Sequence, residues 1–344
     1  MIFNTGVGDE KIDFYDIDSD LIRVYGVWRE GDRYRRIPKS VAETVSEGIF
    51  DMCGTCAGGR VRFLTDSPCL AVKVEYGAYE KSALIPNLAM IGFDIYVDGA
   101  LVGVMPPPMD FNGEELVALK PIGDGNTEKL VTVNLPLYSE IKRMYVGVRA
   151  GSTVKCAPDY KYEKPVVFYG SSITNGAGAT RPGSTYESRI SRELDMNFHC
   201  LGFGGLAKGE LKMAEYIAGL DMSVFVYDYD FNAPTPEHLL ATHEPFFKAV
   251  REKNPDLPII MISRPTAYRG REDTGERYEI IKKTYDNARA AGDERVYLIN
   301  GLDFFGEDGT DLTVEGVHPT DAGYYFMAKG IGSVLKPILE KEKN

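Results

Sequence analysis

The spacing of apolar residues changes near residue 160, and this change constrains the fold more than any other feature of the sequence. Before it, short apolar or alternating runs are separated by turn residues, which is the pattern of β-strands. After it, short apolar runs alternate with helix-start signals. The sequence therefore predicts a β-rich domain over residues 1–157, followed by an α/β domain over residues 158–344.

Seven strands are predicted in the N-terminal half, and no amphipathic helix of normal length is visible there. The predicted strands are Leu21–Tyr25, Arg60–Thr65, Leu70–Tyr76, Phe93–Val97, Leu101–Met105, Leu130–Leu135 and Met144–Val148. Asp98-Gly99 separates two of them and suits a two-residue hairpin turn, because both positions need a positive φ. Several short strands without helices predict a β-sandwich or jelly roll.

Five strands alternate with helices in the C-terminal half. The predicted strands are Pro165–Tyr169, Phe198–Phe203, Ser223–Tyr229, Pro258–Ser263 and Arg295–Asn300. Ser184-Thr-Tyr-Glu187 predicts a capping box at the start of one helix. Strands that alternate with helices form a parallel sheet covered on both faces, so this half is predicted to be a three-layer α/β/α domain.

Charge and hydropathy narrow the choice of partners and location. The net charge of −12 argues against nucleic acid or an anionic membrane as the main partner. No window reaches the roughly 18 continuous apolar residues of a membrane span. The N-terminus has neither a basic start nor an apolar run, so no signal peptide is expected. The sequence as written predicts a cytoplasmic protein, or a secreted or periplasmic one where a leader has been removed.

The five cysteines are scattered and odd in number, which favours free thiols over a disulfide framework. Cys53-Gly-Thr-Cys56 has the spacing of half a metal site or of a redox pair. However, no second pair of cysteine or histidine residues has ligand spacing, and the segment has no βαβ context. We therefore predict no metal and no cofactor.

Polar residues follow four strands or loops of the predicted parallel sheet, at the edge where binding sites form. They are the segments Gly170-Ser-Ser172-Ile-Thr174, Gly202-Phe-Gly-Gly205, Asp228-Tyr-Asp-Phe-Asn232 and Glu315-Gly-Val-His318. Together they supply a hydroxyl, a glycine turn, a carboxamide and an acid–imidazole pair. Acyl transfer needs these groups: a nucleophile, an oriented base and donors for the oxyanion.

At these segments the sequence resembles the SGNH (GDSL-type) hydrolase family, over about residues 165–340. The first segment resembles Gly-Asp-Ser, with Ser172 at the nucleophile position and Ser171 where aspartate is usual. The resemblance implies that Asn232 is an oxyanion donor, together with the amides of Ser172 and Gly205, and that His318 is the base. It also implies a flavodoxin-like core with a five-stranded parallel sheet.

Two positions of the expected site stay open. The oxyanion glycine is predicted to be Gly205, with Gly204 as the alternative. Glu315 stands where the family usually has aspartate, three residues before His318, and we predict that it orients this histidine. Asp311, four residues earlier, is the alternative.

Other functions fit parts of the same sequence. Gly202-Phe-Gly-Gly-Leu-Ala207 followed by Asp228 resembles a dinucleotide fingerprint, but it leaves the nucleophile and base segments unexplained. A non-catalytic carbohydrate-binding protein on a dead hydrolase core is a further alternative. Arg181 and Arg264 are candidate substrate-binding residues, with salt bridges to nearby acids as the competing role.

The β-rich half resembles in general form the domain that precedes this core in a subgroup of the family, some of whose members resemble carbohydrate esterases. We therefore predict a serine esterase that removes short acyl groups, acetyl first, from a carbohydrate. The expected partner is a small-molecule or oligosaccharide ester. A thioesterase or lysophospholipase-type acylhydrolase of the same family is the alternative.

Overall fold

The computed structural model describes residues 2–7, 10–79, 82–266, 272–306 and 309–343. The chain forms two compact units. The β unit comprises Met1–Ile37, Gly54–Asp159 and Thr180–Gly183, and the α/β unit comprises Pro38–Cys53, Tyr160–Ala179 and Ser184–Asn344.

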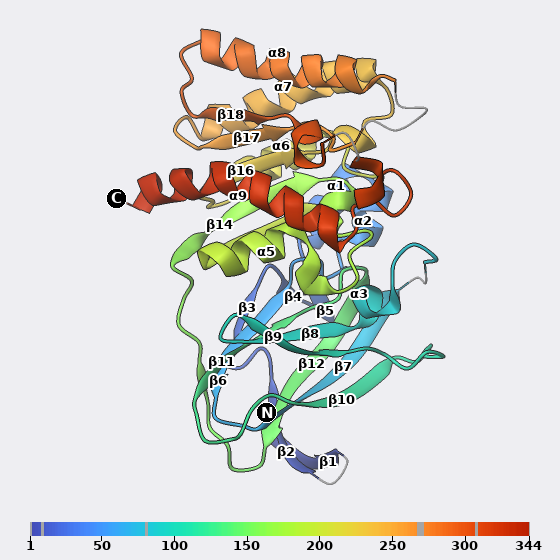
Figure 1. Cartoon of the computed structure of the whole chain (residues 1–344), viewed down its shortest axis with the longest axis vertical. Helices are drawn as coiled ribbons and strands as arrows, with labels where there is room; N and C mark the ends of the chain where they lie inside the picture. The colour runs from blue at the N-terminus through green and yellow to red at the C-terminus, as the bar shows by residue number, and fades with distance from the viewer. Residues whose placement is uncertain (1, 8–9, 80–81, 267–271, 307–308, 344) are drawn as a thin grey trace. The chain divides into compact units, whose positions relative to one another are not determined.

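The β unit contains two antiparallel sheets (Figure 1). One has the order β1-β2-β12-β7-β10, and the other has the order β13-β6-β11-β8-β9, with β3 beside β6. The bounds in the first sheet are β1 Ile2–Val7, β2 Glu10–Asp16, β12 Ser139–Arg149, β7 Cys69–Tyr79 and β10 Glu115–Pro121. Those in the second are β13 Val154–Cys156, β6 Arg60–Thr65, β11 Lys129–Asn134, β8 Phe93–Val97, β9 Ala100–Met105 and β3 Arg23–Tyr25. A separate hairpin pairs β4 Trp28–Glu30 with β5 Arg33–Arg35, and α3 spans Asn87–Ile91.

A single apolar core joins the two large sheets, as expected for the predicted sandwich. Val61 and Phe63 of β6 lie in the same buried cluster as Val72 and Val74 of β7. The predicted hairpin is also present, since Asp98 has φ +48° and Gly99 has φ +82° between β8 and β9. Strands β1, β2, β4, β5, β10 and β13 were not predicted, because their short or charge-rich runs do not stand out from loop sequence.

The α/β unit is built on a five-stranded parallel sheet with the order β15-β14-β16-β17-β18. The bounds are β14 Tyr162–Gly170, β15 Met196–Gly202, β16 Val224–Asp228, β17 Ile259–Ile262 and β18 Val296–Ile299. Numbered by their order in the chain, the strands lie in the order 2-1-3-4-5, which is the flavodoxin-like arrangement. In this arrangement the ligand site lies at the carboxyl ends of the first and third strands, here β14 and β16. The predicted sheet is confirmed.

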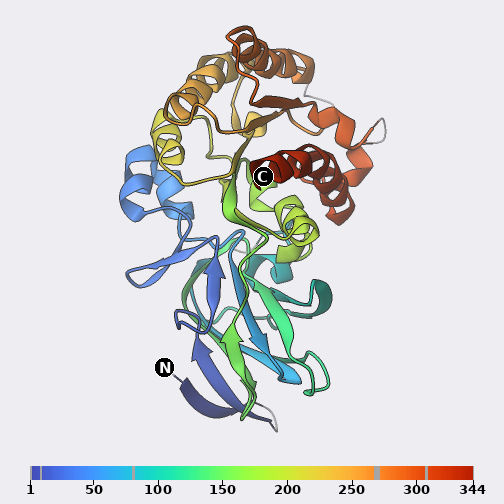
Figure 2. The same ribbon diagram turned by 90° about the vertical axis from the view of Figure 1, so that its left-hand side faces the viewer.

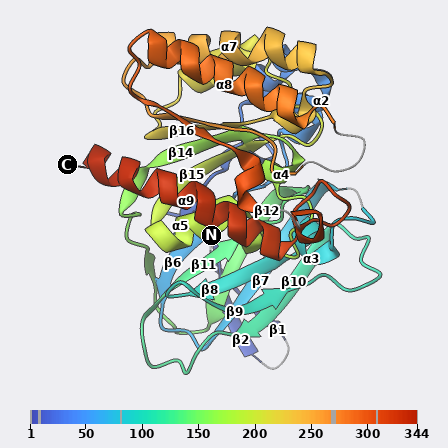
Figure 3. The ribbon, with the colours of Figure 1, turned by 45° about the horizontal axis from the view of Figure 1, so that its top comes forward.

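Helices form two rows on this sheet (Figure 3). Helix α5 (Tyr186–Leu194) contacts α9 (Asp321–Lys343) in one row. In the other row α6 (Leu211–Ala218) contacts α7 (Pro236–Lys253), which contacts α8 (Thr274–Ala290). The predicted three-layer architecture is therefore correct.

One segment from the N-terminal half belongs to the α/β unit. Residues 38–53 form α1 (Lys39–Val45) and α2 (Glu47–Met52), and α1 lies against α6 (Figure 2). A Cβ atom on Gly48 would come within 2.6 Å of a Leu206 methyl group, so α2 packs closely on the loop before α6. The predicted division at residue 157 therefore misses this segment, because helices of six or seven residues show no full amphipathic period.

The predicted capping box at the start of α5 is wrong. Ser184 ends a 3₁₀ turn, and Thr185 is the N-cap, because its Oγ1 accepts a hydrogen bond of 3.3 Å from the Ser188 amide. Glu187 is buried, and neither of its carboxyl oxygens has a hydrogen-bond partner in the described part of the chain. Burial raises the pKa of Glu187 to about 8. This side chain is thus a buried acid rather than a cap.

Among the described residues, no helix has the length and apolar character needed to cross a membrane. The same residues contain no cluster of three or more histidine, cysteine or acidic side chains that could hold a metal ion. All five cysteines are free thiols.

Candidate active site

Ser172 is the first residue of α4 (Ser172–Asn175), which begins two residues after β14 ends. The Ser171 hydroxyl caps this turn by accepting a hydrogen bond of 3.2 Å from the Ile173 amide. A Cβ atom on Gly202 would lie 2.3 Å from the Asn175 nitrogen, so only glycine allows α4 to approach β15 this closely. The local sequence therefore holds Ser172 at the carboxyl edge of the sheet.

Tyr324 of α9 contacts the same turn through its hydroxyl group. Its side chain is fully buried, and its hydroxyl lies 2.9 Å from the Ile173 carbonyl oxygen and 2.7 Å from that of Ala177. These carbonyls lie at and just beyond the end of a short helix, where few backbone donors remain for them; the Ile173 carbonyl also accepts from the Gly176 amide at 3.0 Å. This role of Tyr324 was not predicted from the sequence, because a tyrosine on an apolar helix face resembles an ordinary core residue. Its position six residues after His318 was the available signal.

His318 joins the nucleophile to an acid. Its Nε2 atom lies 2.8 Å from Ser172 Oγ, and its Nδ1 atom lies 2.5 Å from Glu315 Oε1. This is the order required for general-base catalysis: the carboxylate fixes the tautomer with hydrogen on Nδ1, which leaves Nε2 free to accept the serine proton.

Of the two candidate orienters, Glu315 occupies the position beside the imidazole. The His318 amide also donates to Glu315 Oε1, at 3.1 Å, so the carboxylate closes a tight local turn on the residue that it orients. Asp311 lies in the 3₁₀ turn η4 (Gly309–Leu312) with an exposed side chain. The extra methylene of glutamate lets its carboxylate bind both the backbone and the ring of the same histidine.

The glycine turn and the asparagine lie together next to the serine. A Cβ atom on Gly204 would come 3.3 Å from Ser172 Cβ, a tight contact that would require Ser172 to shift by a few tenths of an ångström. The Gly205 amide donates to Asn232 Oδ1 at 3.1 Å, and Asn232 Nδ2 donates to the Phe203 carbonyl at 2.8 Å. A carboxamide has two N–H groups, so Asn232 retains a second donor. The Gly205 amide must release Asn232 before it can bind an oxyanion.

The two predicted substrate-binding arginines make internal salt bridges. Arg264 has no exposed surface, and its Nη2 atom lies 3.1 Å from Asp230 Oδ1. Arg264 therefore matches the competing salt-bridge role, and its contact with substrate stays a prediction. Arg181 Nη1 lies 2.9 Å from Asp94 Oδ2 and 2.5 Å from the Tyr96 hydroxyl, which matches the competing salt-bridge role.

The geometry also argues against the dinucleotide alternative. Gly202 lies directly against the backbone of Asn175 and Thr174, so its lack of a side chain is explained by packing against α4. Asp228, the candidate ribose ligand, is buried, and burial raises its pKa to about 8. A ribose hydroxyl needs an accessible carboxylate, and Asp228 offers none.

Comparison with known families and structures agrees with this geometry. Residues 163–336 match the model of the GDSL-like lipase/acylhydrolase family, and residues 12–154 match GxDLY, the N-terminus of SGNH hydrolase-type esterases. The first match covers half of the chain, so the protein belongs to the GDSL-like lipase/acylhydrolase family. It is thus an SGNH-type hydrolase of the esterase and acylhydrolase class.

Three solved structures are similar over nearly the whole chain. A Bacteroides ovatus protein described as a GDSL-like lipase is 28% identical, with a TM-score of 0.86, and the match covers 96% of this chain and 98% of that one. The salicylyl-acyltransferase SsfX3 of a tetracycline biosynthetic pathway is 21% identical, with a TM-score of 0.78 and coverage of 94% and 97%. A family two carbohydrate esterase from Clostridium thermocellum, in complex with cellohexaose, is 16% identical, with a TM-score of 0.65 and coverage of 93% and 99%. A search of curated protein sequences found no match.

Proposed function

We propose that the protein is a serine esterase that hydrolyses short-chain esters, acetyl esters first, on a carbohydrate. The observation that carries this proposal is the continuous contact from Ser172 Oγ to His318 Nε2, and from His318 Nδ1 to Glu315. A chain of hydrogen bonds in this order activates a serine for attack on an acyl carbon.

In the proposed reaction, His318 Nε2 takes the proton of Ser172 as Oγ attacks the ester carbonyl carbon. The negative oxygen that forms is bound by the Ser172 and Gly205 amides and by Asn232 Nδ2. His318 then gives its proton to the departing alcohol, which leaves an acyl-enzyme. Water attacks this ester with His318 again as base, and the acid and free Ser172 are released.

Two observations support a carbohydrate ester as the substrate. The His318 and Glu315 side chains are 21% and 32% exposed, so the acid–base pair is reachable by an ester on a bulky, polar acceptor. The fold is also shared with a carbohydrate esterase whose structure contains cellohexaose. The expected partner is a small-molecule or oligosaccharide ester.

Fluorophosphonate labelling tests the nucleophile. The reagent should label Ser172 of the wild type, and Ser172→Ala should abolish labelling and lower turnover of 4-nitrophenyl acetate about 10⁴–10⁶-fold. Near-normal turnover in this variant would remove the assignment.

A substrate panel then tests the acyl group and its acceptor. Acetate release from acetylated sugars should exceed hydrolysis of thioesters and lysophospholipids by the same enzyme. Preferential cleavage of a thioester or lysophospholipid would favour the alternative acylhydrolase, and sugar binding without any labelling would favour a non-catalytic carbohydrate-binding protein.

A further inference from the structure

The segment that follows β17, residues 263–266, contacts two different parts of the candidate active site. The Arg264 amide and its Nη2 atom donate to Asp230, at 3.0 and 3.1 Å. Asp230 stands two residues before Asn232 in the same 3₁₀ turn. The Thr266 hydroxyl donates to the carbonyl oxygen of Gly316 at 3.0 Å, in the loop between Glu315 and His318.

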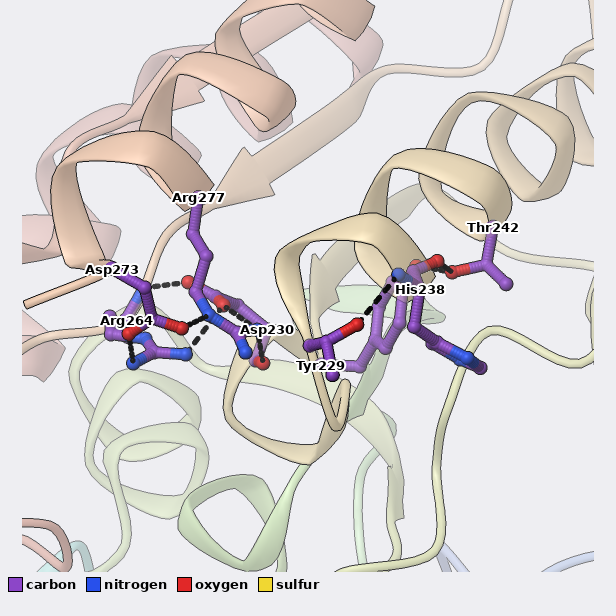
Figure 4. A network of polar contacts seen from close by, with 8 residues as sticks. Tyr229, Asp230, His238, Thr242, Arg264, Asp273 and Arg277 are labelled. Atoms are coloured by element: carbon purple, nitrogen blue, oxygen red, sulfur yellow. Dashed lines mark hydrogen bonds and ion pairs between the residues drawn. The ribbon is translucent and has the colours of Figure 1, made fainter. Parts of the chain in front are cut away.

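Asp230 is the centre of a charge network, defined here as Asp230, Arg264, Asp273 and Arg277 (Figure 4). Arg277 Nη1 lies 3.2 Å from the Asp230 carbonyl oxygen and 3.3 Å from its Oδ1. Asp273 contacts both arginines, at 3.3 Å from Arg264 Nη1 and 2.5 Å from Arg277 Nε. Two positive and two negative side chains therefore balance one another; Asp230 and both arginines are buried, and Asp273 is partly exposed.

The contacts of this network fall on one short turn. Arg264 and Arg277 together bind the carboxylate and the backbone carbonyl of Asp230, and the Arg264 guanidinium lies 4.8 Å from the ring centre of Phe231. The next residue is Asn232. Burial of an ion pair is weak evidence for a gain in stability, because desolvation offsets much of the attraction. The network does hold the Asp230–Asn232 turn in place, through contacts from Arg264 and Arg277.

We propose that Arg264 and Thr266 are positioning residues: from one segment they fix the Asn232 turn through Asp230 and the Glu315–His318 loop through Gly316. This inference rests on the proposed function, because the contacts position catalytic groups only if the Asn232 turn and the Glu315–His318 loop both act in catalysis. The segment sets the distance between the oxyanion donor and the base, and neither residue touches substrate.

Thr266→Val tests the contact with the Glu315–His318 loop. The substitution keeps the shape of the side chain and removes the hydroxyl. We expect kcat for 4-nitrophenyl acetate to fall about 10–100-fold with KM nearly unchanged, because small misplacements of catalytic groups cost this much. Thr266→Ser keeps the hydroxyl and should recover most of the loss.

Asp230→Asn tests the other contact. It removes the charge that the two arginines share and should lower kcat about 10–100-fold as well, for the same physical reason. If this variant folds poorly, Thr266→Val still decides the proposal.

The chain offers a matched control for each change. Thr284 is another buried threonine, whose hydroxyl lies 2.9 Å from His243 Nδ1, and Asp293 pairs with Arg251 at 2.8 Å. Thr284→Val and Asp293→Asn should lower the melting temperature while kcat stays within about twofold of the wild type, since neither residue contacts the candidate site.

The outcomes separate the two proposals. If the wild type is labelled at Ser172 but Thr266→Val and Asp230→Asn behave like their controls, the positioning role is overturned and the esterase stands. If Thr266→Ser fails to recover kcat, the hydroxyl contact is not the cause and the proposal is likewise overturned. If the wild type is not labelled, the proposed function itself has failed.

Discussion

Asp94 of the β unit and Asp230 of the α/β unit are both buried aspartates that bind arginine, yet they lie in different settings. Asp94 is on β8 and accepts hydrogen bonds from Asn134 Nδ2 at 2.7 Å, Arg181 Nη1 at 2.9 Å and the Gly183 amide at 2.8 Å. These partners hold residues 180–183 against an antiparallel sheet of the same unit. Asp230 instead lies beyond a parallel strand, next to Asn232.

The difference shows what a buried carboxylate can be used for. Both aspartates accept hydrogen bonds from several donors, so neither carries a large unmet desolvation cost. Around Asp94 the donors come from segments whose role is to complete a fold. Around Asp230 they surround a turn with a candidate catalytic residue. We therefore expect changes near the α/β site to act on turnover, and changes at Asp94 to act on stability.

After the loss of the nucleophile itself, the largest expected effect is at the acid that orients His318. Glu315→Gln should lower kcat about 10³–10⁴-fold, because an amide stabilises the wrong imidazole tautomer. Asp311→Asn is the matched control and should leave kcat nearly unchanged. A larger loss in Asp311→Asn than in Glu315→Gln, measured with 4-nitrophenyl acetate, would reverse the assignment.

Asn232→Ala should follow, with a loss of about 10²–10³-fold in kcat, or ~3–4 kcal/mol, if its Nδ2 group binds the oxyanion. The KM value should change little, because the donor acts on the transition state. An effect below tenfold would mean that Asn232 holds the Gly205 turn without binding the oxyanion.

Asp94→Asn should lower the free energy of unfolding by about 2–3 kcal/mol, because the Arg181 charge loses its buried partner. Urea unfolding would measure this, and kcat should remain within about threefold. Glu10→Gln, at the exposed pair with Arg149, is the control and should change stability by no more than about 0.5 kcal/mol. If Asp94→Asn lost turnover while its stability stayed unchanged, the proposed difference between Asp94 and Asp230 would be contradicted.

The smallest expected effect is a pH dependence of stability from Glu187. Burial raises its pKa to about 8 in the folded protein, above the value of about 4.3 in an unfolded chain. Between these values the folded protein keeps a proton that the unfolded chain releases, so this contribution is complete below pH ~4 and is lost as pH rises toward 8.

Glu187→Gln removes that titration. Its unfolding free energy should fall less than that of the wild type between pH 6.5 and pH 8, by about 1–2 kcal/mol. Urea unfolding at several pH values measures the two slopes. Parallel curves would show that Glu187 does not titrate in this range.

The sequence predicted the α/β core well because each of its signals is local. Apolar strands recur at regular intervals, and polar residues follow at their carboxyl ends, where the parallel arrangement brings loops together whatever lies between them. Ser172, Asn232 and His318 could therefore be selected before their distances were known. The structure brings their segments together through contacts of Ser172 with His318 and of Gly205 with Asn232.

The misses came from features that depend on distant partners. Residues 38–53 join the α/β unit through packing on α6, which no local period reveals. Arg264 and Tyr324 each form hydrogen bonds with residues far along the chain, at Asp230 and at the α4 turn. The residues around a charged side chain or a tyrosine do not reveal whether that side chain faces solvent, substrate or a buried partner.

The sequence by itself determined that a β-rich half precedes an α/β half, and it determined the four polar segments and their order along the chain. These features could be predicted because hydrophobic periodicity and strand ends depend on residues that are close together in the sequence. Tertiary structure alone decided that Glu315, rather than Asp311, lies on His318 Nδ1, that Gly204 packs against Ser172, and that Arg264 binds Asp230. The physical reason is that hydrogen bonds and desolvation act over a few ångströms, and only the folded chain sets which groups come that close.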